Sequence, residues 1–328
     1  TSGVALTLTK DVTIAGPGAD KVAVSGNAAT RVFVVNSGVR AAIDGLTIRD
    51  GKITGFTNGA GILNSGVLTV TNSVLAANNT QNEGGGIYNI GTLTVLSNTF
   101  ADNAAFRGAG IYNSGSLVVA GTGFERNDGS SEGGGIHNTG TTNVIESAFV
   151  ANRGYMGGGV FSSGTFTATN SSFRNNSNSG NGGGIGIVGG TAALYNSTVY
   201  SNAATFGGGI YVSAGALTVT NSTVANNSAP YGGGIYNGSM LYLRNSLIAN
   251  STGSSDCINS GTLAANTNNL IADGSCSPAL SGDPLLGAFG DYGGDTQTVP
   301  LLPGSPAIDA GDGATCLATD QRGVERPE

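Results

Sequence analysis

Few residues in this chain of 328 could carry acid–base chemistry, and their spacing does not group them. Cleavage of a polysaccharide by two carboxylates requires that they face each other across a cleft. The acids of the central region are Asp102, Glu125, Asp128, Glu132 and Glu146. They occupy different positions of a regular repeat that has almost no insertions, so we expect neither a carboxylate pair nor a cleft. The sequence therefore predicts no catalytic residue.

The only histidine belongs to a column of mostly aromatic residues, one from each of several repeats. Its members are Tyr88, Tyr112, His137, Phe161, Tyr211 and Tyr236. Each follows an aliphatic residue of the expected core, and neighbouring strand residues point to opposite faces, so we expect an exposed aromatic stripe. Such a stripe could stack on sugar rings or pack against another subunit; alternatively, the rings only stack on one another. In either case His137 is expected to replace a tyrosine and not to act as a base or metal ligand.

Aspartates are frequent near the end of the chain. They include Asp283, Asp291, Asp295, Asp309 and Asp312. Ca²⁺ prefers about six to eight oxygen ligands, which makes a calcium site one hypothesis for this segment. The spacing matches no EF-hand loop, and solvated turn and capping residues are the simpler interpretation. No other cofactor is expected.

The three cysteines also lie in this last segment. We favour a disulfide between Cys257 and Cys276, which would brace the segment and leave the repeats unchanged. Because three is an odd number, Cys316 is free, buried, or the true partner of one of the other two.

These residues are positioned by a glycine-rich motif that returns at a nearly constant spacing, as in Gly84-Gly85-Gly86-Ile87. The third positions of its eight copies are Gly61, Gly86, Gly110, Gly135, Gly159, Gly184, Gly209 and Gly234. Steps of 24 or 25 residues predict a solenoid, in which each coil buries its apolar face only against its neighbours. A phosphate-binding loop is a poor interpretation, because no helix and no lysine follow the glycines. We expect turns with positive φ, or backbone packed so closely that no Cβ fits.

Aligned on the glycines, each repeat gives four apolar positions, represented by Ile87, Leu93, Val95 and Phe100. Short stretches rich in β-branched residues separate Gly and Asn turns, and no segment shows helical periodicity. The sequence therefore predicts an all-β parallel β-helix with about 25 residues per coil and almost no helix.

Asparagine recurs once per repeat where a strand ends. This column contains Asn78, Asn103, Asn127, Asn152, Asn176, Asn202 and Asn227. An amide donates and accepts, so stacked asparagines can bond to the coils on either side as a structural ladder.

Charge and cysteine content divide the chain near residue 250. Residues 1–250 carry 10 Asp and Glu against 11 Lys and Arg, whereas residues 251–328 carry 10 against 2. We expect β-helix repeats over 1–250 and a loop-rich, acidic cap or docking region over 251–328. The net charge of −7, with scattered basic residues, argues against nucleic acid as a partner. No apolar run is long enough for a transmembrane segment. The start at Thr1, without a signal segment, is expected for a mature or trimmed chain.

The repeats, such as Gly-Gly-Gly-Ile-Tyr-Asn at 84–89, resemble those of right-handed parallel β-helix proteins, including chlamydial polymorphic outer-membrane proteins. The tail, with Asp-Pro-Leu-Leu at 283–286 and Leu-Leu-Pro-Gly-Ser-Pro-Ala-Ile-Asp-Ala-Gly at 301–311, resembles the bacterial choice-of-anchor Q domain. This resemblance implies a right-handed helix and a secreted or surface-attached bacterial protein. It supplies no enzymatic residues. Because members of that family usually continue past such a tail into an anchoring segment, we expect that the chain was processed or trimmed.

We therefore expect a non-enzymatic structural or adhesive protein at the extracellular face of a bacterium. Its expected partners are other copies of itself, assembled into a fibre or surface array, or cell-surface glycans. The alternative is a β-helix protein that binds or cleaves polysaccharides, as pectate lyases do.

Overall fold

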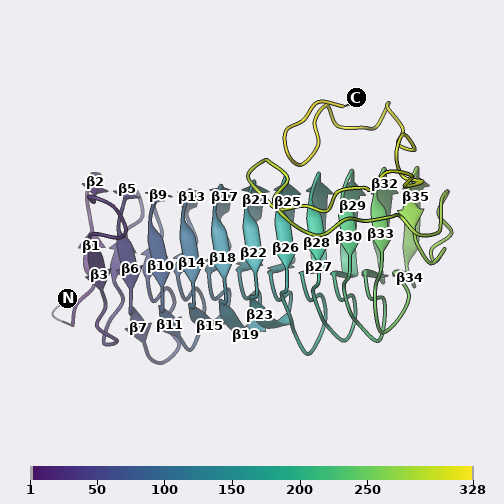
Figure 1. The fold of residues 1–328 in the computed structure, drawn as a ribbon. Helices are drawn as coiled ribbons and strands as arrows, with labels where there is room; N and C mark the ends of the chain where they lie inside the picture. Colours follow the sequence, from purple (N-terminus) through teal and green to yellow (C-terminus); the bar gives the residue numbers. More distant parts are fainter. Residues whose placement is uncertain (1–2, 327–328) are drawn as a thin grey trace.

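The computed structural model describes residues 3–326, which form strands, turns and loops without any helix. The strands stack in parallel, coil upon coil, along one axis (Figure 1). This is the parallel β-solenoid that the glycine spacing predicts. Three sheets run along the solenoid and contain 20, 11 and 5 strands, here called sheets 1, 2 and 3.

Sheet 1 takes two segments from each coil, and in two coils these join into one continuous strand, at Ile185–Tyr195 and Ile210–Thr220. Residue pairing between coils is in register apart from local shifts near Val188 and Tyr242. Its strands are β1 (Leu6–Leu8), β2 (Val12–Ala15), β4 (Phe33–Val35), β5 (Arg40–Asp44), β8 (Ile62–Asn64), β9 (Val67–Thr71), β12 (Ile87–Asn89), β13 (Thr92–Leu96), β16 (Ile111–Asn113), β17 (Ser116–Ala120), β20 (Ile136–Asn138), β21 (Thr141–Ile145), β24 (Val160–Ser162), β25 (Thr165–Thr169), β27 (Ile185–Tyr195), β29 (Ile210–Thr220), β31 (Ile235–Asn237), β32 (Met240–Arg244), β34 (Cys257–Asn259) and β35 (Thr262–Thr267).

Sheets 2 and 3 complete the coil. Sheet 2 contains β3 (Ala23–Ser25), β6 (Thr47–Arg49), β10 (Val74–Ala76), β14 (Thr99–Ala101), β18 (Gly123–Glu125), β22 (Ala148–Val150), β26 (Ser172–Arg174), β28 (Thr198–Tyr200), β30 (Thr223–Ala225), β33 (Leu247–Ala249) and β36 (Leu270–Ile271). Sheet 3 contains β7 (Lys52–Ile53), β11 (Asn79–Thr80), β15 (Ala104–Arg107), β19 (Asp128–Glu132) and β23 (Arg153–Met156).

The core follows the predicted apolar columns. Ile87, Leu93, Val95 and Phe100 are fully buried, and their counterparts form one continuous cluster along the axis. Four phenylalanines of sheet 2 stack coil upon coil, with ring centroids 4.6–4.9 Å apart. Each coil therefore buries its apolar side chains mainly against the coils before and after it.

Glycine is required in this motif for two different reasons, each at a different position. The first glycine, as at Gly84, has φ of +71°, which a side chain rarely adopts. The third has no space: a Cβ on Gly86 would lie 2.5 Å from the carbonyl oxygen of Gly110 in the next coil. Both predicted explanations hold, at different positions of the motif.

The predicted asparagine ladder is continuous from Asn78 to Asn227, and its members are fully buried. The Asn127 Oδ1 accepts hydrogen bonds from the backbone N and the Nδ2 of Asn103, at 3.1 and 2.9 Å. Its Nδ2 donates to the carbonyl of Phe100 and to Asn152 Oδ1, both at 2.9 Å. The left-handed backbone at this turn belongs to the preceding residue, as at Arg126 with φ of +52°.

Two further polar columns lie inside the solenoid. Between the two sheet 1 segments of a coil, an amide chain runs from Asn64 through Asn89, Asn113 and Asn138 to Ser162. Before sheet 2, side chains such as Ser73, Asn98, Thr122 and Ser147 accept from the backbone N of the coil before. Three polar columns therefore hold the turns in register, where the sequence predicted one.

The stacking continues beyond residue 250. Strands β34, β35 and β36 pair with the coil before them, so the acidic region first contributes one more coil. The favoured disulfide, Cys257–Cys276, is present at this end, and Cys316 is free.

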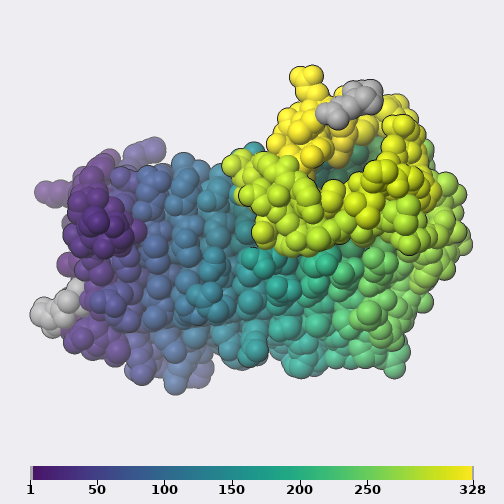
Figure 2. All heavy atoms as spheres, viewed as in Figure 1, coloured from purple at the N-terminus to yellow at the C-terminus, as the bar shows by residue number. Residues whose placement is uncertain are grey.

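The rest of the tail then turns back and lies along the side of the C-terminal half of the solenoid (Figures 1 and 2). It docks on a second asparagine column, whose members have positive φ. The hydrogen-bonded pairs are Asn268 with Ala310, Asn245 with Asp312, Asn221 with Leu317 and Asn196 with Thr319. At residues 3–326 no helix is long and apolar enough to cross a membrane.

Candidate functional site

The aromatic column forms two stacks on the outer side of the first segment of sheet 1. In the longer stack, Tyr88, Tyr112, His137 and Phe161 lie ring on ring, with centroids 4.6–5.1 Å apart. Tyr211 and Tyr236 form the shorter stack, at 5.5 Å. The tyrosines are half-buried, but His137 and Phe161 are only 3% and 5% exposed. The expectation of an exposed stripe is therefore wrong at these two positions.

A second column of side chains, at the end of sheet 3, lies against the aromatic column. Its members pair in parallel from coil to coil: Glu83, Arg107, Glu132, Met156, Asn181, Phe206 and Tyr231. Arg107 lies between the two acids, with nitrogen–oxygen distances of 3.5 Å to Glu83 and 2.9 Å to Glu132. Further along, the Phe206 ring packs edge-on against Tyr236. This column is why the stripe is covered: the chain folds back over it before each glycine turn.

His137 lies beneath this charged group. Its Nδ1 is 3.5 Å from the Glu132 carboxylate and makes no hydrogen bond within the described part of the chain. Burial, and next the positive charge of Arg107, lower the pKa of His137 to about 3. The negative charge of Glu132 does not reverse this shift in the pKa of His137, because the Arg107 guanidinium, 2.9 Å away, neutralises it. The imidazole is thus neutral and enclosed, which suits a stacked ring and not a general base that must reach a substrate.

Tyr88 and Tyr112 are the accessible end of the stack. Burial raises the pKa of both phenols, and the nearby charge of Glu83 adds to the effect. They remain protonated near neutral pH and can donate hydrogen bonds.

The tail aspartates do not converge. Asp283, Asp291 and Asp312 each accept a hydrogen bond from the backbone N two residues later, which is the geometry of a capped turn. Asp309 has a positive φ of 58°. Within residues 3–326, these acids and Asp295 contribute to no group of three or more potential metal ligands. The structure thus gives three of them the turn-capping role.

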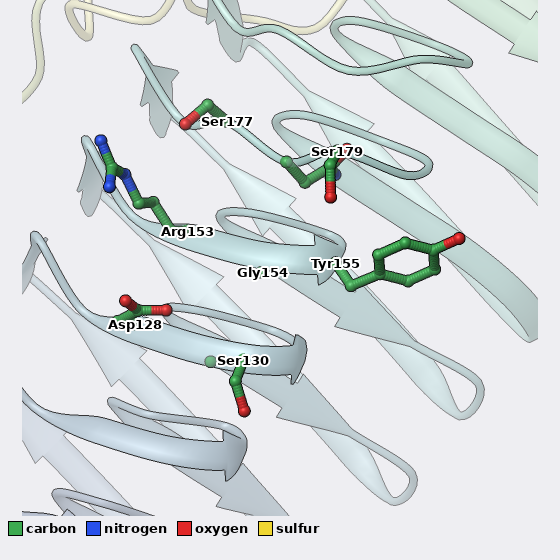
Figure 3. Close-up of a pocket in the computed structure, with 9 residues that line it drawn as sticks. Asp128, Ser130, Arg153, Gly154, Tyr155, Ser177 and Ser179 are labelled. Atoms are coloured by element: carbon green, nitrogen blue, oxygen red, sulfur yellow. The ribbon is translucent and has the colours of Figure 1, made fainter.

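A shallow hollow lies on the outer face of sheet 3, where the sequence predicted no site (Figure 3). It has a volume of about 290 Å³ and spans three coils. One side is lined by Asp128, Arg153 and Ser177, which share one register position. The opposite side is lined by Ser130, Tyr155 and Ser179, and strand backbone lies between the two sides. Sequence periodicity did not single out these residues because their types differ from coil to coil.

The side chains of the hollow have unused hydrogen-bonding capacity. In the described structure, Asp128 and Arg153 form no ion pair with each other or with a third residue, although their backbones pair directly. The Asn178 amide donates to the carbonyls of Asn181 and Gly182, while its Oδ1 lacks a partner. The Tyr155 side chain is 55% exposed. Charged, amide and aromatic groups therefore meet on one exposed surface.

The chain matches no family model, no curated protein and no solved structure.

Proposed function

We propose that this chain is a non-enzymatic structural or adhesive protein, in which the solenoid serves as a stiff extracellular rod. The observation that carries the proposal is the continuity of the interior. The apolar cluster extends from Val32 to Ile271, and the buried amide column joins coil to coil over most of that length. A coil in the middle cannot bend away from its neighbours without breaking buried hydrogen bonds.

The placement of the acidic groups also supports a non-enzymatic role. Glu83 and Glu132 lie close to the aromatic column, and both form ion pairs with Arg107. Two carboxylates that are held by one guanidinium do not face a substrate across a cleft.

The surface location rests on the resemblance of the repeats and the tail to choice-of-anchor Q and polymorphic outer-membrane proteins. An oxidising compartment is compatible with the Cys257–Cys276 disulfide. We include a right-handed coil and attachment to a bacterial cell surface in the proposal on this basis.

The proposal is tested by incubating the purified chain with polygalacturonate and with neutral polysaccharides, and by measuring newly formed chain ends. We expect no release above that of a heat-denatured sample. Release that increases with protein concentration would show an enzyme and refute the non-enzymatic role.

Assembly into a fibre or array is a separate part of the proposal. Light scattering over a wide concentration range should show a mass that increases with concentration. Monomers throughout that range would remove self-assembly from the account and leave the rod itself unaffected.

A further inference from the structure

We propose that the hollow on sheet 3 binds a neutral, hydroxyl-rich saccharide. The inference deepens the proposed adhesive function, because it assigns the adhesive contact to particular residues. It rests on three features of the hollow: its shape, its unpaired polar groups and its exposed aromatic ring.

The shape follows from the alternation of residues along β19 and β23. Asp128 and Ser130 are exposed on the outer face, whereas Gly129 between them is buried. In the next coil Arg153 and Tyr155 are exposed, with the partly buried Gly154 between them. The hollow is thus a groove that runs along the solenoid axis, between two outward columns (Figure 3). Three coils span about 10 Å at ordinary strand spacing, which is enough for a di- or trisaccharide lying along the axis.

The polar groups suit a ligand with neighbouring hydroxyls. Asp128 can only accept hydrogen bonds and Arg153 can only donate them, so a vicinal diol placed between them satisfies both. Arg126 and Asp102 have the same relation on adjacent coils, and they are paired at 2.9 Å. In the hollow, the two opposite charges remain separate and are free to bind a ligand.

The aromatic ring supplies the second kind of contact that sugars need. The Tyr155 ring lies over Gly180, where a Cβ would be 3.1 Å from the ring, so the absence of a side chain allows the ring to rest there. A ring held in place offers contact area to the apolar face of a pyranose at low entropic cost.

Other ligand classes fit less well. Asp128 would repel a uronate or phosphate close to Arg153, and the net charge of −7 opposes a polyanion. An apolar peptide side chain would need an apolar pocket, and the lining is composed mostly of serine, glycine and charged residues. The neutral saccharide is the ligand that uses both charges and the ring.

The test is affinity electrophoresis of the native chain in gels that contain laminarin, mannan, galactan or dextran, with polygalacturonate as the acidic probe. We expect at least one neutral polysaccharide to retard the wild type. Tyr155→Ala and Asp128→Asn should each weaken that retardation by about fivefold, because each removes one contact of the order of 1 kcal/mol. Phe106→Ala is the matched control: Phe106 is an exposed aromatic of sheet 3 outside the hollow.

The outcomes separate the two proposals. If no neutral polysaccharide retards the wild type, if only polygalacturonate does, or if Tyr155→Ala binds as well as the wild type, the saccharide assignment is wrong. None of these results affects the non-enzymatic role, whose test is the absence of cleavage, or the rod, whose test is electron microscopy. Circular dichroism and the unfolding transition of each variant show whether a loss of binding is local.

Discussion

Two adjacent asparagines, Asn175 and Asn176, show how strongly one position of a coil can differ from the next. Asn176 is fully buried; it accepts from Asn152 and donates to Phe149 and Asn202. Asn175 is exposed and has φ of +54°. Asparagine is therefore needed at 176 for its side-chain hydrogen bonds, and it suits 175 because it tolerates a left-handed backbone.

We predict that Asn176→Ala lowers the free energy of unfolding by about 2–4 kcal/mol, because buried donors and an acceptor lose their partner. Asn175→Gly should change it by less than about 0.5 kcal/mol, since glycine readily adopts positive φ. Denaturant unfolding of both variants measures the difference. Equal effects of the two substitutions would show that the ladder does not carry the stability assigned to it.

His137 gives a pH dependence with a definite sign. The unfolded chain takes up a proton near pH 6.5, whereas burial and Arg107 delay protonation of the folded chain until about pH 3. Glu132 and Tyr112 also face the ring, and neither offsets the burial. Stability is therefore fully present above pH 6.5 and falls below it, by about 1.4 kcal/mol per pH unit from this group.

His137→Phe tests this sign, because phenylalanine keeps the stack with Tyr112 and Phe161 but cannot titrate. Between pH 7.5 and 4.5 the wild type should lose more stability than the variant, and the two curves should differ most at the acid end. Thermal unfolding at each pH gives the comparison. Parallel curves would mean that the imidazole is not held neutral.

At the residue scale, the features that repeat from coil to coil could be predicted from the sequence. The apolar columns, the ladder from Asn78 to Asn227 and the role of the glycines follow from the period alone. The covering of His137 by Arg107 and Glu132 was not predictable in the same way. Periodicity shows which residues stack, but not which neighbouring column folds over them.

Among the elements, the tail depends on contacts that no local pattern reveals. Gln321 is 8% exposed; its Nε2 donates to Thr296 Oγ1 at 2.8 Å, and its Oε1 accepts from Thr198 Oγ1 at 2.7 Å. The Phe289 ring stacks on Tyr200, also far away in sequence. Cysteine content and charge predicted that the tail differs from the repeats. Its return along the solenoid depends on side-chain contacts between residues about a hundred positions apart, such as Thr198 with Gln321.

We predict that Gln321→Ala loosens the tail without unfolding the coils. Hydrogen exchange of residues 282–326 should become about tenfold faster, because Thr198 and Thr296 lose buried partners, while sheets 1 and 2 stay protected. Gln297→Ala is the matched control, since Gln321 uses only the Gln297 carbonyl. If hydrogen exchange is unchanged in Gln321→Ala, or becomes faster throughout the solenoid, Gln321 does not hold the tail against the coils as we predict.

For the whole molecule, the regular coils account for both the proposed rod and the shallow form of the hollow on sheet 3. The glycine turn and the asparagine turn recur from coil to coil, so the solenoid gains length by adding similar coils. The hollow at Tyr155 arises where outward residues depart from the repeat. Function in such a fold is expected on its surface, at irregular positions, and not in its interior.

Electron microscopy of the native protein tests the rod most directly. Eleven strands of sheet 2 at about 4.8 Å give a stack of about 50 Å, and we predict straight, unbranched particles of this length, or of end-to-end multiples of it, that are wider over the half that carries the tail. Particles that bend at internal joints, or that are compact in every view, would contradict the stiff rod on which the proposed function rests.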